Sequence, residues 1–244
     1  MNPTLRRTLI AFLVNLACLV AFMPLAASAA SVTGSGQSAT EARQVGEFQA
    51  IALRGAIDAV VRQGPTAVSV TADDNLLPHL ETVVEGGTLQ VRWKSGSSVR
   101  TRAKVQVAIS TPRLSALASA GSGDVRLSGL DTPSLKLSLS GSGDAVLDSI
   151  TTEELALSIS GSADVKGSGK AGKLSISISG SGDVRLGELK ADDVRISIAG
   201  SGDAEVNAAK ALEVSIAGSG DVVYSGDAAL KSRVAGSGTV TRKR

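Results

Sequence analysis

One short string returns again and again in the second half of this chain. It is clearest in ISISGSGDVRL (Ile176–Leu186), where a glycine-rich corner separates two alternating stretches. The first glycines of the seven corners stand at intervals of 20, 20, 19, 20, 18 and 18 residues, at Gly121, Gly141, Gly161, Gly180, Gly200, Gly218 and Gly236. A period this short, with one corner per unit and almost no room for a helix, predicts an all-β solenoid of the parallel β-helix type. An antiparallel sandwich is the alternative, but it would not place the same turn sequence in every unit.

The residues before each corner indicate which side chains form the core. Within Leu135–Ser140, leucines alternate with lysine and serine, and the same alternation returns in the later units. Coils stacked about 4.8 Å apart would place each aliphatic side chain over its copy. Each buried aliphatic then contributes about 1.5–3 kcal/mol, so we expect the repeat to build a continuous core.

The first residues have the features of an export signal. Residues 1–29 hold two arginines, an apolar stretch and the small residues AASAA, which predicts a secretory signal peptide. A retained membrane anchor is disfavoured because Asn15 and Pro24 interrupt the apolar stretch. A lipid-modified Cys18 is also disfavoured, since Asn15 replaces the aliphatic residue expected three positions earlier. We therefore expect an exported chain without a membrane span in its mature form, in the periplasm, at the cell envelope or outside the cell.

Charge and cysteine content exclude several classes of function. The chain has 25 Lys and Arg against 23 Asp and Glu, and removing the signal peptide removes two arginines, which leaves 23 against 23. A neutral mature chain gives no reason to expect a nucleic-acid partner. The only cysteine is Cys18, so the mature chain has no disulfide and no thiol chemistry.

Composition divides the mature chain into four parts. Residues 30–44 are rich in Gly, Ser and Thr without hydrophobic periodicity, and predict a flexible linker. Residues 45–110 alternate irregularly and predict β-strands, including a hairpin turn at Glu85–Gly87. The regular repeat covers 111–240, and a basic tail covers 241–244. Because open strand edges attract other chains, we expect 45–110 to cover one end of the solenoid and the tail to discourage stacking at the other.

Two irregular stretches and the corners together resemble a known family. The stretches are VGEFQAIALRGAIDAVVRQGPTAVSVTADDNLL (residues 45–77) and EGGTLQVRW (residues 85–93). With the GSGD corners they resemble the bacterial head GIN domain family, catalogued as a "putative autotransporter adhesin head" and formerly as a domain of unknown function. The resemblance covers Val45 to Val240. It implies a right-handed parallel β-helix, an exported location, an adhesin-like role and no established catalytic activity.

The corners contain the first candidate site, a column of six carboxylates. These are Asp124, Asp144, Asp164, Asp183, Asp203 and Asp221. Like charges about 5 Å apart repel, so something must offset them. One interpretation is that each aspartate accepts backbone N–H bonds within its own corner, as in an Asx turn. The other is calcium binding, although only one aspartate turn occurs per 18–20 residues, where calcium-binding β-rolls have one every nine. We expect no cofactor, with calcium as the alternative.

The outward positions of the strands contain the second candidate site. It is a ladder of serines: Ser138, Ser140, Ser158, Ser160, Ser175, Ser177, Ser179, Ser197 and Ser215. Small side chains on stacked strands make a flat, uncharged face, which we predict to bind a protein or glycan of the cell envelope or a second copy of the chain. Ice binding is an alternative for such a face, but charged residues such as Arg195 and Glu213 interrupt it.

An enzyme acting on polysaccharides is the remaining alternative, because other parallel β-helices have that activity. Such catalysis needs an asymmetric cluster of acids and bases in a cleft. The mature chain offers a repeating column instead, one histidine (His79), and three aromatic residues, Phe48, Trp93 and Tyr224. The sequence therefore predicts a non-catalytic binding or structural module.

Overall fold

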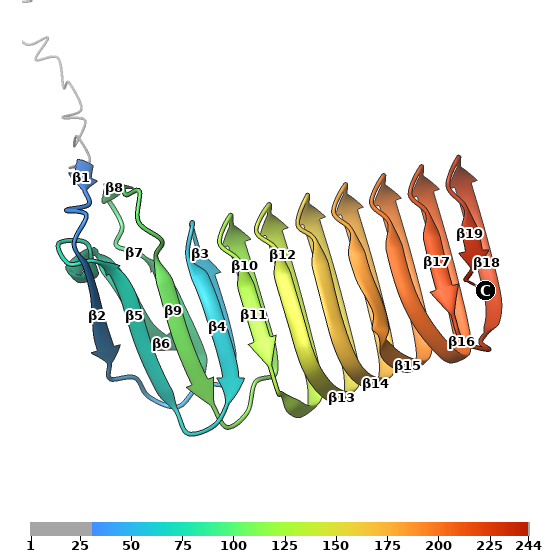
Figure 1. The fold of residues 1–244 in the computed structure, drawn as a ribbon, viewed down its shortest axis with the longest axis horizontal. Helices are drawn as coiled ribbons and strands as arrows, with labels where there is room; N and C mark the ends of the chain where they lie inside the picture. Colours follow the sequence, from blue (N-terminus) through green and yellow to red (C-terminus); the bar gives the residue numbers. More distant parts are fainter. Residues whose placement is uncertain (1–30, 244) are drawn as a thin grey trace, which may run out of the picture. The chain divides into compact units, whose positions relative to one another are not determined.

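Each repeat unit folds into one coil with two strand faces joined by a sharp corner and a rounded bend (Figure 1). The computed structural model describes residues 31–243. The predicted signal peptide (residues 1–29) lies outside the described residues. The strand that precedes each corner lies on what we call the leading face, and the strand that follows it lies on the trailing face. The chain is a β-solenoid of stacked parallel coils, which confirms the predicted fold class.

The elements follow one another as strands with a single short helix. In chain order they are β1 (Ser31–Thr33), β2 (Ser38–Arg43), β3 (Ala50–Arg54), β4 (Asp58–Gln63), β5 (Ala67–Asp73), the 3₁₀ helix η2 (Leu77–His79), β6 (Leu80–Glu85), β7 (Thr88–Trp93), β8 (Ser98–Arg100), β9 (Gln106–Thr111), β10 (Ala116–Gly121), β11 (Val125–Ser128), β12 (Asp131–Gly141), β13 (Ala145–Gly161), β14 (Val165–Gly180), β15 (Val184–Gly200), β16 (Ala204–Gly218), β17 (Val222–Ser225), β18 (Ala229–Gly236) and β19 (Val240–Arg242). The long strands β13–β16 each run from the trailing face through the bend onto the leading face.

The aliphatic columns of the repeat form the core. On the leading face Ile159, Ile178 and Ile198 stand opposite one another in adjacent strands, and each is at most 2% exposed. The columns stay in register at every corner, and the register shifts lie in the bend, for example between Leu186 and Lys190 of β15. The varying intervals between corners therefore come from bends of different length, and the columns that supply the stability remain intact.

The N-terminal strands continue the same stack. β3 pairs in parallel with β10 on the leading face, and β4 pairs in parallel with β11 on the trailing face. Beyond them, β7 and β9 extend the two faces. The outermost strands then reverse direction: β6 is antiparallel to β7 across the predicted hairpin turn, and β5 and β2 follow β9 in antiparallel pairs. The solenoid thus begins within 45–110, where the sequence predicted only irregular strands.

The structure corrects the prediction of a flexible linker. Residues 31–33 form β1 and pair with β8, and residues 38–43 form β2 and pair with every residue of β5 except Ala67. The side chain of Thr40 also bonds that of Thr71 across this pair at 2.8 Å. The segment lacks an apolar pattern, so its order comes from backbone pairing with a strand some 30 residues away, which local composition does not reveal.

The two ends of the stack differ. At the N-terminal end the chain crosses between β5 and β6 through η2, and this connection buries Leu76 and Leu77. The predicted tail does not stand apart from the repeat, because Val240–Arg242 forms β19 and pairs with β17 in the last coil. Within residues 31–243, no helix is long and apolar enough to span a membrane.

Candidate functional site

The corner requires glycine at its first position. Gly200 has φ +139°, and a Cβ built on it would lie 2.1 Å from the carbonyl oxygen of Gly180 in the adjacent coil. The same φ region and the same close approach recur at the other first glycines of the repeat. The third corner position has no such φ, and Ala163 occupies it in one coil. The first glycine is therefore the stricter of the two, because it needs both a left-handed conformation and space.

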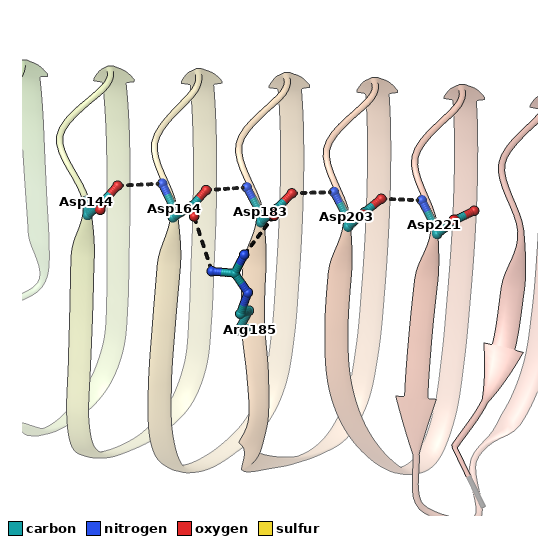
Figure 2. Close-up of polar contacts among 6 residues, drawn as sticks. All are labelled: Asp144, Asp164, Asp183, Arg185, Asp203 and Asp221. Carbon is teal, nitrogen blue, oxygen red and sulfur yellow. Dashed lines mark hydrogen bonds and ion pairs between the residues drawn. The ribbon is translucent and has the colours of Figure 1, made fainter.

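The six predicted aspartates lie in one column, and Figure 2 shows five of them. In the first five, Oδ1 accepts a hydrogen bond from the backbone N–H of the aspartate in the next coil, at distances between 2.8 and 3.0 Å. The bond joins two coils, which corrects the interpretation that each aspartate bonds within its own corner. The neighbouring backbone also bonds across coils, as in Val184 N–H to the carbonyl oxygen of Asp203 at 2.8 Å. The column therefore fixes the register of one coil on the next.

The column is longer than the sequence predicted. Asp58 at the start of β4 accepts the N–H of Asp124 at 3.0 Å, so it adds one carboxylate at the N-terminal end. At the other end Thr239 donates both its N–H (2.7 Å) and its hydroxyl (2.8 Å) to Asp221. The missed signal was the spacing of Gly55 and Asp58, which equals that of glycine and aspartate in the later corners although Ile57 fills the third position.

One arginine offsets the repulsion in the middle of the column. Arg185 reaches Oδ2 of Asp164 at 3.2 Å and Oδ2 of Asp183 at 2.9 Å (Figure 2). Elsewhere the N–H dipoles of the next coil face the carboxylates. Within residues 31–243 no group of three or more His, Cys, Asp or Glu side chains is arranged to hold a metal ion. Calcium binding by the column stays an alternative to the prediction of no cofactor, and it needs its own test.

The serine ladder forms a flat surface on the leading face, which we call the small-residue face. It consists of two rows across the six strands β10 and β12–β16. The first row holds Ala118, Ser138, Ser158, Ser177, Ser197 and Ser215, and the second holds Ala120, Ser140, Ser160, Ser179, Ala199 and Ala217. Members of a row stand opposite one another in register, and all are exposed except Ser138, which is half-buried.

Two details of this face differ from the sequence prediction. Ser175 lies in a third row, between Ala156 and Arg195, at the border of the small-residue face. Ala118 and Ala120 extend the face by one coil. A prediction based on serine alone does not include them, although the alternation in ALASAG (residues 116–121) matches that of the repeat. The face is therefore defined by small size and not by the hydroxyl group.

Charged pairs line the border of the small-residue face. In the third row Arg195 Nε bonds Glu213 at 3.1 Å, and Lys231 lies 3.7 Å from the same carboxylate. The hydrogen bond from Arg195, and then the nearby charge of Lys231, lower the pKa of Glu213 below its usual value. These groups are exposed, so each pair contributes little to stability. Their main effect is to place alternating charges beside an uncharged strip.

The aromatic side chains do not form a platform for sugar rings. Phe48 and Tyr224 are 4% and 8% exposed and belong to the core. Trp93 is half-buried and packs against the core near Gly55. Stacking on sugars needs exposed aromatic faces, so these three residues give no support to the polysaccharide-enzyme alternative.

The comparisons with known proteins agree on one family. Residues 47–228 match the family described as "Putative auto-transporter adhesin, head GIN domain". The chain belongs to this family, as the resemblance in the sequence indicated. No match is found among the curated proteins.

Solved structures of proteins from Bacteroides and Parabacteroides have the same fold. A putative adhesin from Bacteroides fragilis NCTC 9343 superposes with a TM-score of 0.77 at 24% identity, covering 87% of this chain and 100% of that one. A putative adhesin from Parabacteroides merdae ATCC 43184 has a TM-score of 0.73 at 25% identity, covering 88% and 99%. A putative lipid binding protein from Parabacteroides distasonis ATCC 8503 has a TM-score of 0.73 at 24% identity, covering 88% and 100%. The likeness to the first and third of these establishes the fold alone.

Proposed function

We propose that this chain is an exported, non-catalytic binding module of the cell envelope that holds its partner on the small-residue face. The observation that carries the proposal is the pair of exposed Ser and Ala rows, in register across six coils. The strands beneath are fixed by the aliphatic core and by the aspartate column. A partner would therefore meet a preorganised surface, which lowers the entropy lost on binding.

The family supports an adhesin-like role rather than catalysis. Its description and the names of two similar structures refer to adhesins. The face suits a partner that is itself regular, such as a glycan strand or a sheet, because its side chains repeat about every 4.8 Å between strands. The features of a signal peptide in residues 1–29 support export to the periplasm, the envelope surface or the medium.

Substituting large, charged side chains into the small-residue face tests the proposal. Residues 31–244 are incubated with the cell-envelope fraction of the producing bacterium, and the bound protein is measured by sedimentation and immunoblotting. The double substitution Ser158→Arg with Ser177→Arg should reduce binding about tenfold or more, because it removes close contact over the centre of the face. Ala209→Arg, at an exposed position in the bend of β16, is the matched control and should bind normally. All three proteins should melt at the same temperature. Normal binding by the double variant would contradict the proposal.

Calcium binding at the aspartate column is tested separately. We expect added calcium to leave the melting temperature of residues 31–244 unchanged, because one oxygen of each aspartate already accepts an N–H from the next coil. A rise in melting temperature that Asp144→Asn abolishes would instead assign the column as a calcium site, since calcium takes six to eight oxygen ligands and must recruit several coils.

A further inference from the structure

The leading face ends at the C-terminus in a strand with one unpaired edge. Among residues 31–243, β18 pairs only with β16, over all eight of its residues, so its outer edge has free backbone donors and acceptors. Leu230 and Val234 of β18 are 41% and 42% exposed, and they are the exposed large hydrophobic residues of the described chain. Their counterparts one coil earlier, Leu212 and Ile216, are each 1% exposed. One more strand on this edge would cover both exposed side chains.

The N-terminal end of the solenoid is protected in ways that β18 is not. There η2 crosses the end, and Glu41 and Arg43 form an ion pair on the inner side of β2, opposite buried valines of β5. Covering segments and inward-pointing charges keep a sheet edge from pairing with other chains. The inner row of β18 is Leu230, Ser232 and Val234, which holds no charge. The edge of β18 is therefore open to a strand from outside the chain.

The outward side chains of β18 indicate the charge of such a strand. In the third row of the leading face, Arg195, Glu213 and Lys231 alternate in charge from one strand to the next. An acidic residue opposite Lys231 would continue this alternation, since opposite charges on neighbouring strands attract. Arg233 has no carboxylate within ion-pair distance in the described chain. A second acidic residue, opposite Arg233, would give this cation a partner.

The trailing edge at the same end is a poorer site. Its last strand, β19, has three residues, against eight in β18. Arg242 of β19 pairs with Asp227, and the adjacent Lys243 pairs with Glu205 at 2.7 Å. Exposed aliphatic surface, a free backbone edge and a cation without a carboxylate partner therefore coincide on β18.

We propose that the outer edge of β18 binds an extended segment of another protein, which alternates aliphatic with acidic residues and adds one strand to the leading face. Its backbone pairs with the free donors and acceptors of β18, which supplies affinity, while its side chains supply specificity. The aliphatic side chains cover Leu230 and Val234 and continue the inner columns. The acidic side chains between them face Lys231 and Arg233. This alternation reads the same in both directions, so it fits a parallel or an antiparallel strand.

A second copy of the chain does not fit this edge. Antiparallel pairing of two β18 strands centred on Ser232 places Lys231 opposite Arg233 twice, and centring on either cation places it opposite itself. The N-terminal end of a second copy is excluded by shape, because β2 extends its trailing face one strand beyond β6, whereas β18 and β19 end at the same level. A single strand meets neither obstacle. The site is also independent of the small-residue face, which lies along the side of the solenoid.

A designed peptide tests the proposal. It has the sequence of residues 211–218 with Ser215→Glu, so three aliphatic residues alternate with two glutamates. The peptide carries a fluorescent label, and its anisotropy is measured as residues 31–244 are added. We expect saturable binding below about 1 mM protein. A second peptide, with lysine in place of both glutamates, should bind about tenfold more weakly or worse, because like charges then face each other.

Charge reversal on the protein gives the reciprocal test. Arg233→Glu should weaken binding of the acidic peptide about tenfold and strengthen binding of the lysine peptide. Lys136→Glu is the matched control, because Lys136 lies in the same row as Lys231 but in the middle of the leading face. It should bind both peptides as the wild type does. Both substituted positions are exposed, so neither variant should differ from the wild type in melting temperature.

Each result decides the proposal. Saturable binding of the acidic peptide, weaker binding by Arg233→Glu and slower amide exchange within residues 229–236 on binding support it. Absence of binding up to about 1 mM, or equal binding of the two peptides, overturns it. A sedimentation mass that rises with wild-type concentration and falls back in Arg233→Glu would assign the edge to a second copy and overturn it. So would phosphatidylglycerol vesicles that bind the wild type but not Arg233→Glu while the acidic peptide stays unbound, since they would assign the edge to a membrane surface.

Discussion

The N-terminal coils and the repeat coils build the same two-faced core by different means. In the repeat, every corner has glycine first and every strand is parallel to its neighbours. In the N-terminal part only Gly55 and Asp58 keep the corner pattern, and the outer strands turn antiparallel. The comparison shows which features continue from the repeat into the N-terminal part: the first glycine of the corner, its carboxylate and the aliphatic columns. The serine and the second glycine of the corner can vary, since Ala56 and Ile57 replace them in the N-terminal part, where β3 and β4 still pair with the repeat.

The two parts also differ in how they use charge. The N-terminal part buries the carboxylate of Asp73, which accepts the hydroxyl of Thr101 at 2.6 Å and the N–H of Gly36 at 3.1 Å. The repeat keeps its aspartates at the surface and links them from coil to coil. A terminal region has no neighbouring coil on one side, so individual hydrogen bonds such as those of Asp73 hold its loops in place. In the repeat, the same inter-coil hydrogen bond recurs from one coil to the next.

The largest expected effect concerns the inner column of the repeat. Ile176 is 1% exposed and Ser177 is exposed on the opposite side of the same strand. Ile176→Asp should lower the free energy of unfolding by about 4 kcal/mol or more, because it buries a charge without a partner. Ser177→Asp should change it by less than about 0.5 kcal/mol. Urea unfolding followed by circular dichroism measures both, and equal losses would refute the assigned facing.

A smaller but still large effect is expected at the corners. Gly180→Ala places a Cβ 2.2 Å from the carbonyl oxygen of Gly161 at φ +135°, so we expect a loss of about 3 kcal/mol from strain and overpacking. Gly46→Ala, in the N-terminal part, has nothing within 4 Å and no left-handed φ, and should cost almost nothing. Thermal unfolding of the two variants measures the loss of stability caused by each substitution. A Gly180→Ala protein as stable as the wild type would show that the corner can relax.

The aspartate column should contribute similarly in both parts. Asp203→Ala and Asp58→Ala each remove the acceptor of one inter-coil N–H, at 2.8 and 3.0 Å. We expect each to cost about 1 kcal/mol, the usual value for one hydrogen bond, or 2–4 °C in melting temperature for a chain of this size. Calorimetry can resolve this shift. A loss at Asp203 without one at Asp58 would mean that the column does not continue into the N-terminal part.

The smallest expected effect depends on pH. The pKa of Glu213 is lowered by Arg195 and Lys231, so ionised Glu213 contributes stability above its unfolded-state pKa of 4.5. That contribution is lost as the pH falls through the lower folded-state value. Glu213→Gln should therefore melt slightly below the wild type at pH 7 and match it in acid. A difference that grows on acidification would contradict this assignment.

Much of the repeat, but less of its surroundings, could be predicted from the sequence. Ile176 and its column were predictable because a period of two reports directly which side is buried. The corner at Asp58 is not predictable in the same way, because Ile57 replaces a corner glycine. SATEAR (residues 38–43) has no apolar pattern, so it predicts a linker although it forms β2. The inter-coil bond of each aspartate could not be predicted either, since its donor lies about one coil away in the sequence. Local pattern reports burial, whereas partners across coils depend on the stacked structure.

The central claim is that the small-residue face holds the partner, and photo-crosslinking tests it most directly. Cys18 is the only cysteine of the chain, so a cysteine introduced into residues 31–244 can carry a photoreactive label without competition. Labelled Ser177→Cys and labelled Ala209→Cys are each irradiated with the cell-envelope fraction. We predict a cross-linked partner from Ser177→Cys and none from Ala209→Cys. Cross-links from Ala209→Cys alone, or equally from both positions, would contradict the claim.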